Sequence, residues 1–308
     1  MNEAMATFQQ LLSQAVENRA SDLHIKQDSP VALRIDSKMV SVDFTPDKAF
    51  MEDVMRSMAD ERKLETYDRT GDMDLSYAFS GGRFRVNVHK QRGLHAMTLR
   101  HVKSKIFKFE DLGLPPVMEK IAMAQRGIVL ICGTTGSGKS TTLAAMLNYI
   151  NKREPKHIIT IEDPIEYEFY DDMSFFEQRE VGIDCDSFYG ALTHALRQDP
   201  DIIMVGEMRD KESFEAAIQA ADTGHLVLST VHAASASQVV GRILDLYPKT
   251  ERDAILNSLS ENLHAVVAQR LLPKALGNGV VPIIEVMIAT PVVKGHLANH
   301  EIEKLQDD

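Results

Sequence analysis

The sequence predicts an α/β fold in which a doubly wound parallel sheet follows a smaller α+β domain. From Ile128 onward, short and almost wholly apolar segments alternate with helical patterns, as in a parallel sheet that helices cover on both faces. Over the first hundred residues, strand-like segments instead alternate polar and apolar residues, which is typical of an antiparallel sheet with one core face. The length of 308 residues, at roughly 100–200 residues per domain, corresponds to about two domains.

The first domain is predicted to begin with a helix and to continue into short strands. Apolar residues recur at helical spacing ahead of Ser21, namely Met5, Phe8, Leu12 and Ala15. Strand-like runs follow at residues 22–25 and 31–35, and a second helix is predicted over residues 48–58.

An antiparallel sheet is predicted to complete this domain. Residues 72–79 alternate and place one apolar set on a single face, namely Met73, Leu75, Tyr77 and Phe79. Gly81 and Gly82 indicate a turn. After the turn, Phe84, Val86 and Val88 face one way, and the opposite face carries Arg83, Arg85, Asn87 and His89. A strand at residues 95–102 follows, which gives a small sheet with one core face and one polar face.

A linker is predicted at residues 103–113, with one domain over residues 1–107 and the next over residues 108–308. The stretch from Gln91 to Phe109 holds no acid and five cations, namely Arg92, Arg100, Lys103, Lys105 and Lys108. Two interpretations stay open: a solvated connection, or a strip that faces phosphate or an acidic neighbour.

The second domain is predicted to contain buried parallel strands at residues 128–132, 158–161, 202–205 and 226–230. The intervening segments have helical periodicity. Three apolar stripes carry this pattern: Leu143, Met146, Leu147 and Ile150; Phe214, Ala217, Ile218 and Ala221; and Val239, Val240, Ile243, Leu244 and Tyr247.

Composition excludes several classes of protein. A content of 44% hydrophobic residues argues against disorder. The 34 basic and 45 acidic residues give a net charge of −11, which disfavours nucleic-acid binding through phosphate contacts. Cys132 and Cys185 are too few for a four-thiolate zinc site. With no recognisable signal peptide or transmembrane run, the chain is predicted to be cytoplasmic.

A phosphate-binding loop is the strongest motif. Residues 133–140 fit G-x-x-x-x-G-K-[ST] and are Gly133, Thr134, Thr135, Gly136, Ser137, Gly138, Lys139 and Ser140, followed by Thr141. An apolar strand precedes the loop and an amphipathic helix follows it. Backbone N–H groups there cradle phosphate oxygens, Lys139 is predicted to reach the β- and γ-phosphates, and Ser140 to ligate Mg²⁺. The alternative is a glycine-rich turn without nucleotide.

Acidic residues follow two of the later strands. Glu162, Asp163 and Glu166 come after the second strand, at the edge of an open α/β sheet where ligands bind. Carboxylates there are suited to orient an attacking water or to hold Mg²⁺ through water; the alternative is helix capping and surface charge. Glu207 ends the apolar run 202–205 after Gly206, as in a Walker B strand, and is predicted to address the hydration shell of Mg²⁺.

His225 and His232 flank the strand at residues 226–230. A metal site would require further ligands at suitable spacing, and none is evident in the sequence. Two interpretations remain: core or capping histidines, or polar sensors that contact the γ-phosphate.

These motifs, in this order, resemble the secretion-type ATPases and within them the type IV pilus retraction motors of the PilT/PilU branch. The resemblance spans most of the chain, from residues 21–24 to residues 289–291, and includes residues 178–182, 196–201 and 206–210. It places Glu166 at the family's catalytic glutamate position and residues 224–232 at its histidine box.

The resemblance implies hexameric rings with an N-terminal PAS-like domain and a C-terminal RecA-like domain that turn over ATP with Mg²⁺. ATP then lies between the two domains, arginines close over its phosphates, and turnover changes the interdomain angle. Arg85 on the polar sheet face becomes a candidate for nucleotide contact, as do Arg197, Arg209 and Arg242, each with an ordinary salt bridge as the alternative. The implied partners are an inner-membrane pilus platform protein and a paralogous pilus motor, with no nucleic acid.

Two departures bear on the direction of the motor. Extension motors of this family carry a four-cysteine zinc insert, which two cysteines cannot form. The segment after Thr290 and Pro291 differs from the family's retraction-specific stretch, which favours a PilU-like or divergent member. The chain also stops at residues 306–308 without a terminal domain, so a truncated C-terminus is an open expectation. The alternatives are a type II or type IV secretion motor, a nucleic-acid translocase, and an accessory ATPase of low turnover.

Overall fold

The computed structural model describes residues 3–102, 105–275 and 279–306. The chain divides into two compact units, Met1–Ser104 and Lys105–Asp308. The predicted linker is wrong in part, because helix α4 (Phe109–Leu112) lies within it and buries Phe109 in the core of the second unit. Lys103 of the predicted basic strip lies outside the described residues.

The first unit contains a six-stranded antiparallel sheet in the order β3-β2-β1-β6-β5-β4. Its strands are β1 (Asp22–Lys26), β2 (Ala32–Ile35), β3 (Lys38–Ser41), β4 (Asp72–Phe79), β5 (Gly82–Gln91) and β6 (Leu94–Val102). Its helices are α1 (Glu3–Glu17), α2 (Lys48–Met58) and α3 (Glu61–Thr70). The predicted helices α1 and α2 are confirmed, whereas β3 and α3 were not predicted.

One face of this sheet forms the core of the first unit. Phe8 and Leu12 of α1 and Met51 of α2 are fully buried in one cluster with Val86 and Val88 of β5. The apolar alternation in β5 therefore predicted the core face correctly. The opposite face carries Asp22 of β1, Arg85 of β5 and Arg100 of β6, which are neighbours in the ladder.

The second unit contains a seven-stranded sheet in the order β13-β12-β7-β11-β10-β8-β9. Its strands are β7 (Gly127–Cys132), β8 (His157–Glu162), β9 (Phe175–Glu180), β10 (Ile202–Val205), β11 (Leu226–Val231), β12 (Leu263–Pro273) and β13 (Val280–Ile288). Neighbouring strands are parallel except β12 and β13, which form an antiparallel hairpin. β9, β12 and β13 were not predicted.

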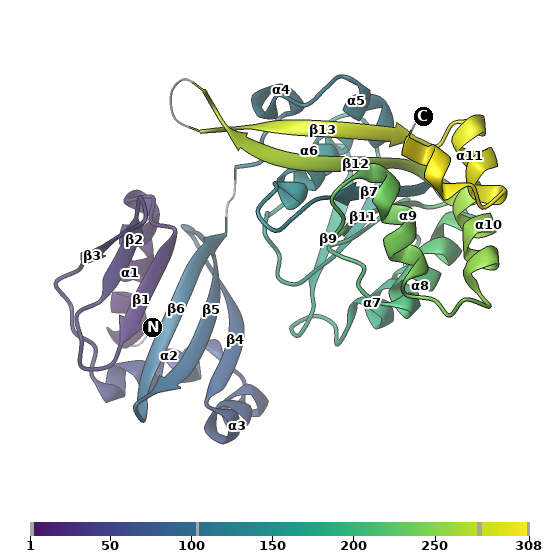
Figure 1. Cartoon of the computed structure of the whole chain (residues 1–308). Helices are drawn as coiled ribbons and strands as arrows, with labels where there is room; N and C mark the ends of the chain where they lie inside the picture. The colour runs from purple at the N-terminus through teal and green to yellow at the C-terminus, as the bar shows by residue number, and fades with distance from the viewer. Residues whose placement is uncertain (1–2, 103–104, 276–278, 307–308) are drawn as a thin grey trace. The chain divides into compact units, whose positions relative to one another are not determined.

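Helices cover both faces of this sheet, which confirms the doubly wound prediction (Figure 1). They are α5 (Val117–Ala122), α6 (Lys139–Asn151), α7 (Phe188–Ala195), α8 (Lys211–Asp222), α9 (Ala236–Leu244), α10 (Arg252–Asn262), α11 (Pro291–Ala298) and the 3-10 helix η1 (Ile302–Gln306). In β7, Ile128 and Leu130 face one core cluster while Val129 and Ile131 face the other. Within the described ranges, no helix is long and apolar enough to cross a membrane.

The β12–β13 hairpin extends beyond the other strands of the sheet (Figure 1). β7 pairs with β12 only as far as Ala268, whereas β12 and β13 remain paired as far as Pro273 and Val280. Leu272, Val280, Val281 and Ile283 of this outer part are exposed apolar residues.

Candidate functional site

The phosphate loop connects β7 to α6, as the motif predicted. The buried strand delivers the chain into the loop, and α6 begins at Lys139 with its N-terminal N–H groups towards it. Gly133 has a φ of 153°, and a Cβ there would lie 2.4 Å from the carbonyl oxygen of Gln269. Gly138 has a φ of 88°, and a Cβ there would lie 2.7 Å from Nε2 of Gln269. Both positions therefore require glycine.

Gln269 of β12 forms hydrogen bonds with the phosphate loop and with α6. It was not identified from the sequence. Its Nε2 donates to the Ser137 carbonyl at 2.8 Å, and its Oε1 accepts from the Thr142 hydroxyl at 2.6 Å. Ser137, Thr142 and Gln269 are all less than 5% exposed. The side chain thereby joins the loop to the first turn of α6 and holds the two in fixed register.

Lys139 and Ser140 begin α6 and make polar contacts within the site. Nζ of Lys139 donates to the carbonyl oxygens of Gly133 and Thr134 at 3.0 and 3.1 Å. Burial lowers the pKa of Lys139, and the carboxylates of Glu207 and Glu166 oppose this shift. The Ser140 hydroxyl donates to Oε1 of Glu166 at 3.1 Å.

A cavity of about 290 Å³ opens beside this loop at the carboxyl ends of the parallel strands. It brings together ten of the predicted site residues: Thr135, Gly136, Lys139, Ser140, Glu162, Asp163, Glu166, Glu207, Arg209 and His232. Apolar side chains complete the lining, among them Leu143, Phe169, Phe188 and Met204. Residues that lie almost a hundred positions apart thus converge on one space.

Glu162 and Glu166 occupy contrasting environments although both line the cavity. Glu162 is 6% exposed and accepts hydrogen bonds from the Thr160 hydroxyl, the Gln178 amide and the Glu166 backbone N–H. Burial raises the pKa of Glu162 to about 7. Glu166 is exposed beside Ser140. An exposed carboxylate can reach a ligand in the cavity, whereas Glu162 has its oxygens engaged within the protein.

Glu207 lies at the same edge, where its carboxylate forms an ion pair with Arg209 and lies 3.7 Å from Nε2 of His232. Gly206 permits close approach of the chains, since its N–H donates to the Ile161 carbonyl at 2.8 Å. Glu207, Arg209 and His232 therefore form one polar group that lines the same cavity as the phosphate loop.

His225 is a correction to the predicted site, because it lies at the opposite edge of the sheet from His232. It precedes β11, whose first residue pairs with Gly127 at the start of β7, far from the loop that follows β7. Its Nδ1 lies 2.9 Å from the Ala220 carbonyl and 3.0 Å from the Thr223 hydroxyl. His225 thus caps the connection after α8, which is the structural alternative for this residue.

Three predicted arginines lie away from the cavity lining. Arg197 is exposed just beyond α7, and Arg242 of α9 lies 3.9 Å from Asp245, the ordinary salt bridge expected as its alternative. Arg85 is exposed on β5 in the first unit, where it pairs in register with Arg100. Its contact with nucleotide stays a prediction.

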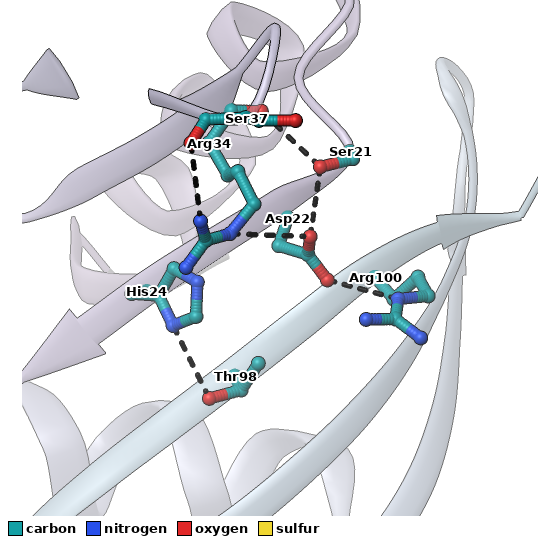
Figure 2. A network of polar contacts seen from close by, with 7 residues as sticks. All are labelled: Ser21, Asp22, His24, Arg34, Ser37, Thr98 and Arg100. Carbon is teal, nitrogen blue, oxygen red and sulfur yellow. Dashed lines mark hydrogen bonds and ion pairs between the residues drawn. The ribbon is translucent and has the colours of Figure 1, made fainter. Parts of the chain in front are cut away.

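The polar face of the first unit carries an ordered charge network (Figure 2). Asp22 is 5% exposed and bonds to Arg100 at 2.9 Å and to the Ser21 hydroxyl at 2.8 Å, while Arg34 lies 3.9 Å away. Burial alone would raise the pKa of Asp22, but its bonds to Ser21 and Arg100 outweigh burial and lower it. His24 lies beside this network, 3.4 Å from Thr98.

The donor set at the cavity suits a small hard cation and not a resident transition metal. Among the residues that the structure describes, no group of three or more His, Cys, Asp or Glu side chains is arranged to hold a metal ion. Ser140 and Glu207 supply oxygen donors at the cavity, and the loop supplies the glycine cradle for phosphate oxygens. This combination fits Mg²⁺, which binds a few protein oxygens together with water and phosphate.

Comparison with known proteins decides the family. A family model described as "Type II/IV secretion system protein" matches residues 3–292. The chain belongs to this family.

Two relatives of this chain are named as pilus ATPases. The "Type IV pilus ATPase PilU" of Pseudomonas aeruginosa is 40% identical over 304 residues, covering 97% of this chain and 79% of the relative. The "Type IV pilus retractation ATPase PilT" of the same organism is 37% identical over 298 residues, covering 96% and 86%. The crystal structure titled "Pilus Retraction Motor PilT and Bound ADP" has a TM-score of 0.90 at 39% identity and covers 97% of this chain and 88% of that one.

Proposed function

We propose that this chain is an ATPase that powers type IV pilus retraction. The observation that carries the proposal is the convergence of the phosphate loop, Glu166 and Glu207 on one cavity. The names of the PilU and PilT relatives, and their cover of nearly the whole chain, support the pilus as the place of action.

In the proposed reaction, the loop N–H groups and Lys139 hold the phosphates of ATP. Glu166 orients a water for attack on the γ-phosphorus and takes up its proton, while the bond to the bridging oxygen breaks and ADP and phosphate leave. Ser140, and Glu207 through water, would hold Mg²⁺, which would neutralise charge on the phosphate oxygens. His232 lies beside Glu207 and is proposed to sense the loss of the γ-phosphate, while Arg209, paired with Glu207, remains a candidate for contact with the phosphates.

The proposed assembly is a homo-hexamer on the cytoplasmic side of the inner membrane. There, turnover changes the angle between the two units and acts on the pilus platform protein, with a paralogous pilus motor as a further partner. The net charge of −11 supports docking on protein and disfavours a nucleic-acid translocase. A type II or type IV secretion motor would use the same chemistry on another cargo.

The test compares Glu166→Gln with the matched control Glu168→Gln. Glu168 lies two residues further along the same segment, accepts from the Tyr170 hydroxyl at 2.9 Å and is not among the cavity-lining residues. Glu166→Gln should lower ATP turnover about 10²- to 10⁴-fold, because it removes the base while the phosphate-binding groups remain. Glu168→Gln should retain turnover, and both variants should bind ATP like the unchanged protein.

The same variants test the cellular role. Deleting the gene should give cells with extra, unretracted pili, and the unchanged gene or Glu168→Gln should restore retraction while Glu166→Gln should not. Loss of all pili on deletion would instead indicate an extension motor, and an unchanged pilus number would indicate another cargo. Near-normal turnover of Glu166→Gln would exclude Glu166 as the base.

A further inference from the structure

The segment that carries Glu166 has no regular secondary structure of its own. Between the end of β8 at Glu162 and the start of β9 at Phe175, the chain forms neither a helix nor a strand. Ile165, Tyr167 and Phe169 in this segment are nevertheless buried. Buried N–H groups require partners, and neither a helix nor a strand runs through this segment to supply them.

Side chains from β8 and β9 supply those partners. The Ile165 N–H donates to Oε2 of Glu180 at 3.2 Å, and the Phe169 N–H donates to Oε1 of Gln178 at 2.8 Å. Between them, the Glu166 N–H donates to Oε2 of Glu162 at 3.3 Å. The backbone is therefore bonded at Glu166 and on both sides of it.

Gln178 uses both ends of its carboxamide. Its Nε2 donates to the Tyr167 carbonyl at 2.8 Å and to Oε1 of Glu162 at 3.1 Å, while Oε1 accepts from Phe169. A carboxamide has two N–H donors, and both are engaged here. Only a side chain that has two donors and an acceptor can make all three of these contacts.

The register of the two strands explains why these side chains meet. Thr160 pairs with Gln178 and Glu162 pairs with Glu180 across the parallel β8–β9 ladder. Alternate residues of a strand share a face, so all four polar side chains point to the same side of the sheet. β9 is the edge strand of the sheet. The segment with Glu166 contacts β9 through the bonds to Gln178 and Glu180.

We propose that Gln178 and Glu180 are positioning residues that fix the backbone around Glu166 and so keep its carboxylate beside Ser140 in the cavity. The inference rests on the proposed function, in which Glu166 orients the attacking water. Gln178 and Glu180 are absent from the cavity-lining residues, so they act through Glu166. This assigns a role to Gln178 and Glu180 within the segment 178–182 that the family resemblance includes.

The experiment uses the full chain with Gln178→Met, which keeps the length of the side chain without its hydrogen bonds, and Gln178→Glu, which keeps the acceptor and loses both donors. The first readout is hydrogen–deuterium exchange without nucleotide. Amides of residues 165–169 should exchange about tenfold faster in both variants. Each lost bond frees either a buried N–H group or a group that holds the segment in place. Unchanged exchange at these residues would overturn the proposal.

Asn151→Ala provides the matched control. Asn151 ends α6 and anchors the far half of the same segment, accepting from the N–H groups of Asp172 and Ser174 and donating to the Tyr170 carbonyl. Its loss should raise exchange at residues 170–174 and leave kcat within about threefold of the unchanged protein.

The second readout is ATP turnover. Gln178→Met should lower kcat about 10- to 100-fold with little change in KM, because the phosphate loop is untouched. In a Glu166→Gln background, Gln178→Met should lower kcat by less than threefold, since its effect passes through Glu166. An equal cost in both backgrounds would show a merely structural role and overturn the proposal. If the unchanged protein hydrolyses no ATP, the proposed function fails, and exchange at residues 165–169 still decides whether Gln178 fixes this segment.

Discussion

Replacing Gln269 by leucine tests how much the phosphate loop depends on one side chain of β12. Leucine is close in size to glutamine, so the substitution removes the bonds to Ser137 and Thr142 without opening a large cavity. The Ser137 carbonyl and the Thr142 hydroxyl would then be buried without these partners.

The magnitude follows from the burial of the two groups. A buried polar group that loses its partner costs about 1–3 kcal/mol. The Thr142 hydroxyl can turn to the carbonyl one helical turn earlier, which recovers part of its share. The free energy of unfolding is expected to fall by about 3 kcal/mol. For a unit of this size, that lowers the melting temperature by roughly 6–12 °C.

Thermal melting of the full chain at fixed concentration and without nucleotide measures this effect. Gln125→Leu is the control, because Gln125 is exposed and its Nε2 donates to the nearby Met123 carbonyl at 3.3 Å. Its effect should stay within about 0.5 kcal/mol. Adding Thr142→Val to Gln269→Leu should restore part of the loss, since the unpaired hydroxyl is then removed as well. A melting temperature within about 2 °C of the unchanged protein would refute the reasoning, as would a further fall in the double variant.

Two further predictions concern charged groups at the cavity. Lys139→Ala should weaken ATP binding itself, by about tenfold or more, because it removes a charge-assisted contact to phosphate; equal ATP affinity by calorimetry would contradict the phosphate cradle. Burial raises the pKa of Glu162 from 4.5 to about 7, so the unfolded chain releases this proton first and stability falls as pH rises between those values. Glu162→Gln should therefore gain stability relative to the unchanged protein at pH 8 and lose that advantage towards pH 5, and melting curves with a constant difference across this range would exclude a raised pKa.

Local sequence patterns predicted the elements that position the site. The run of apolar residues in β7, the glycines of the loop and the stripe on α6 are contiguous, so the phosphate loop needed no long-range information. The alternation in β5 likewise identified the core face of the first unit, because period two directly reports which side is buried.

Long-range contacts could not be predicted in this way. Gln269 lies 132 residues from Ser137, and nothing in its apolar neighbourhood indicates a partner in the loop. β9 was missed because an edge strand with a partly exposed face, Phe175–Glu180, has neither a full apolar run nor a clean alternation. These elements are defined by pairing with distant strands, which sequence periodicity does not report.

The error at His225 has a geometric cause. His225 lies seven positions before His232, and the family resemblance placed both in one histidine box. The intervening β11 is a fully buried strand of six residues, which at about 3.3 Å per residue spans roughly 20 Å. Residues at the two ends of a strand therefore belong to opposite edges of the sheet, however close they are in the sequence.

β12 also gives the second unit a mechanical property. It is a single strand that passes beneath the phosphate loop at Gln269 and continues to Pro273, where only β13 accompanies it. An extended backbone is already close to its maximum length, so it resists stretching along its axis. A pull on the outer part of the hairpin is therefore transmitted to Gln269, and through it to Ser137 and the start of α6. A force on the hairpin and the position of the phosphate loop are thus coupled through the one extended strand β12.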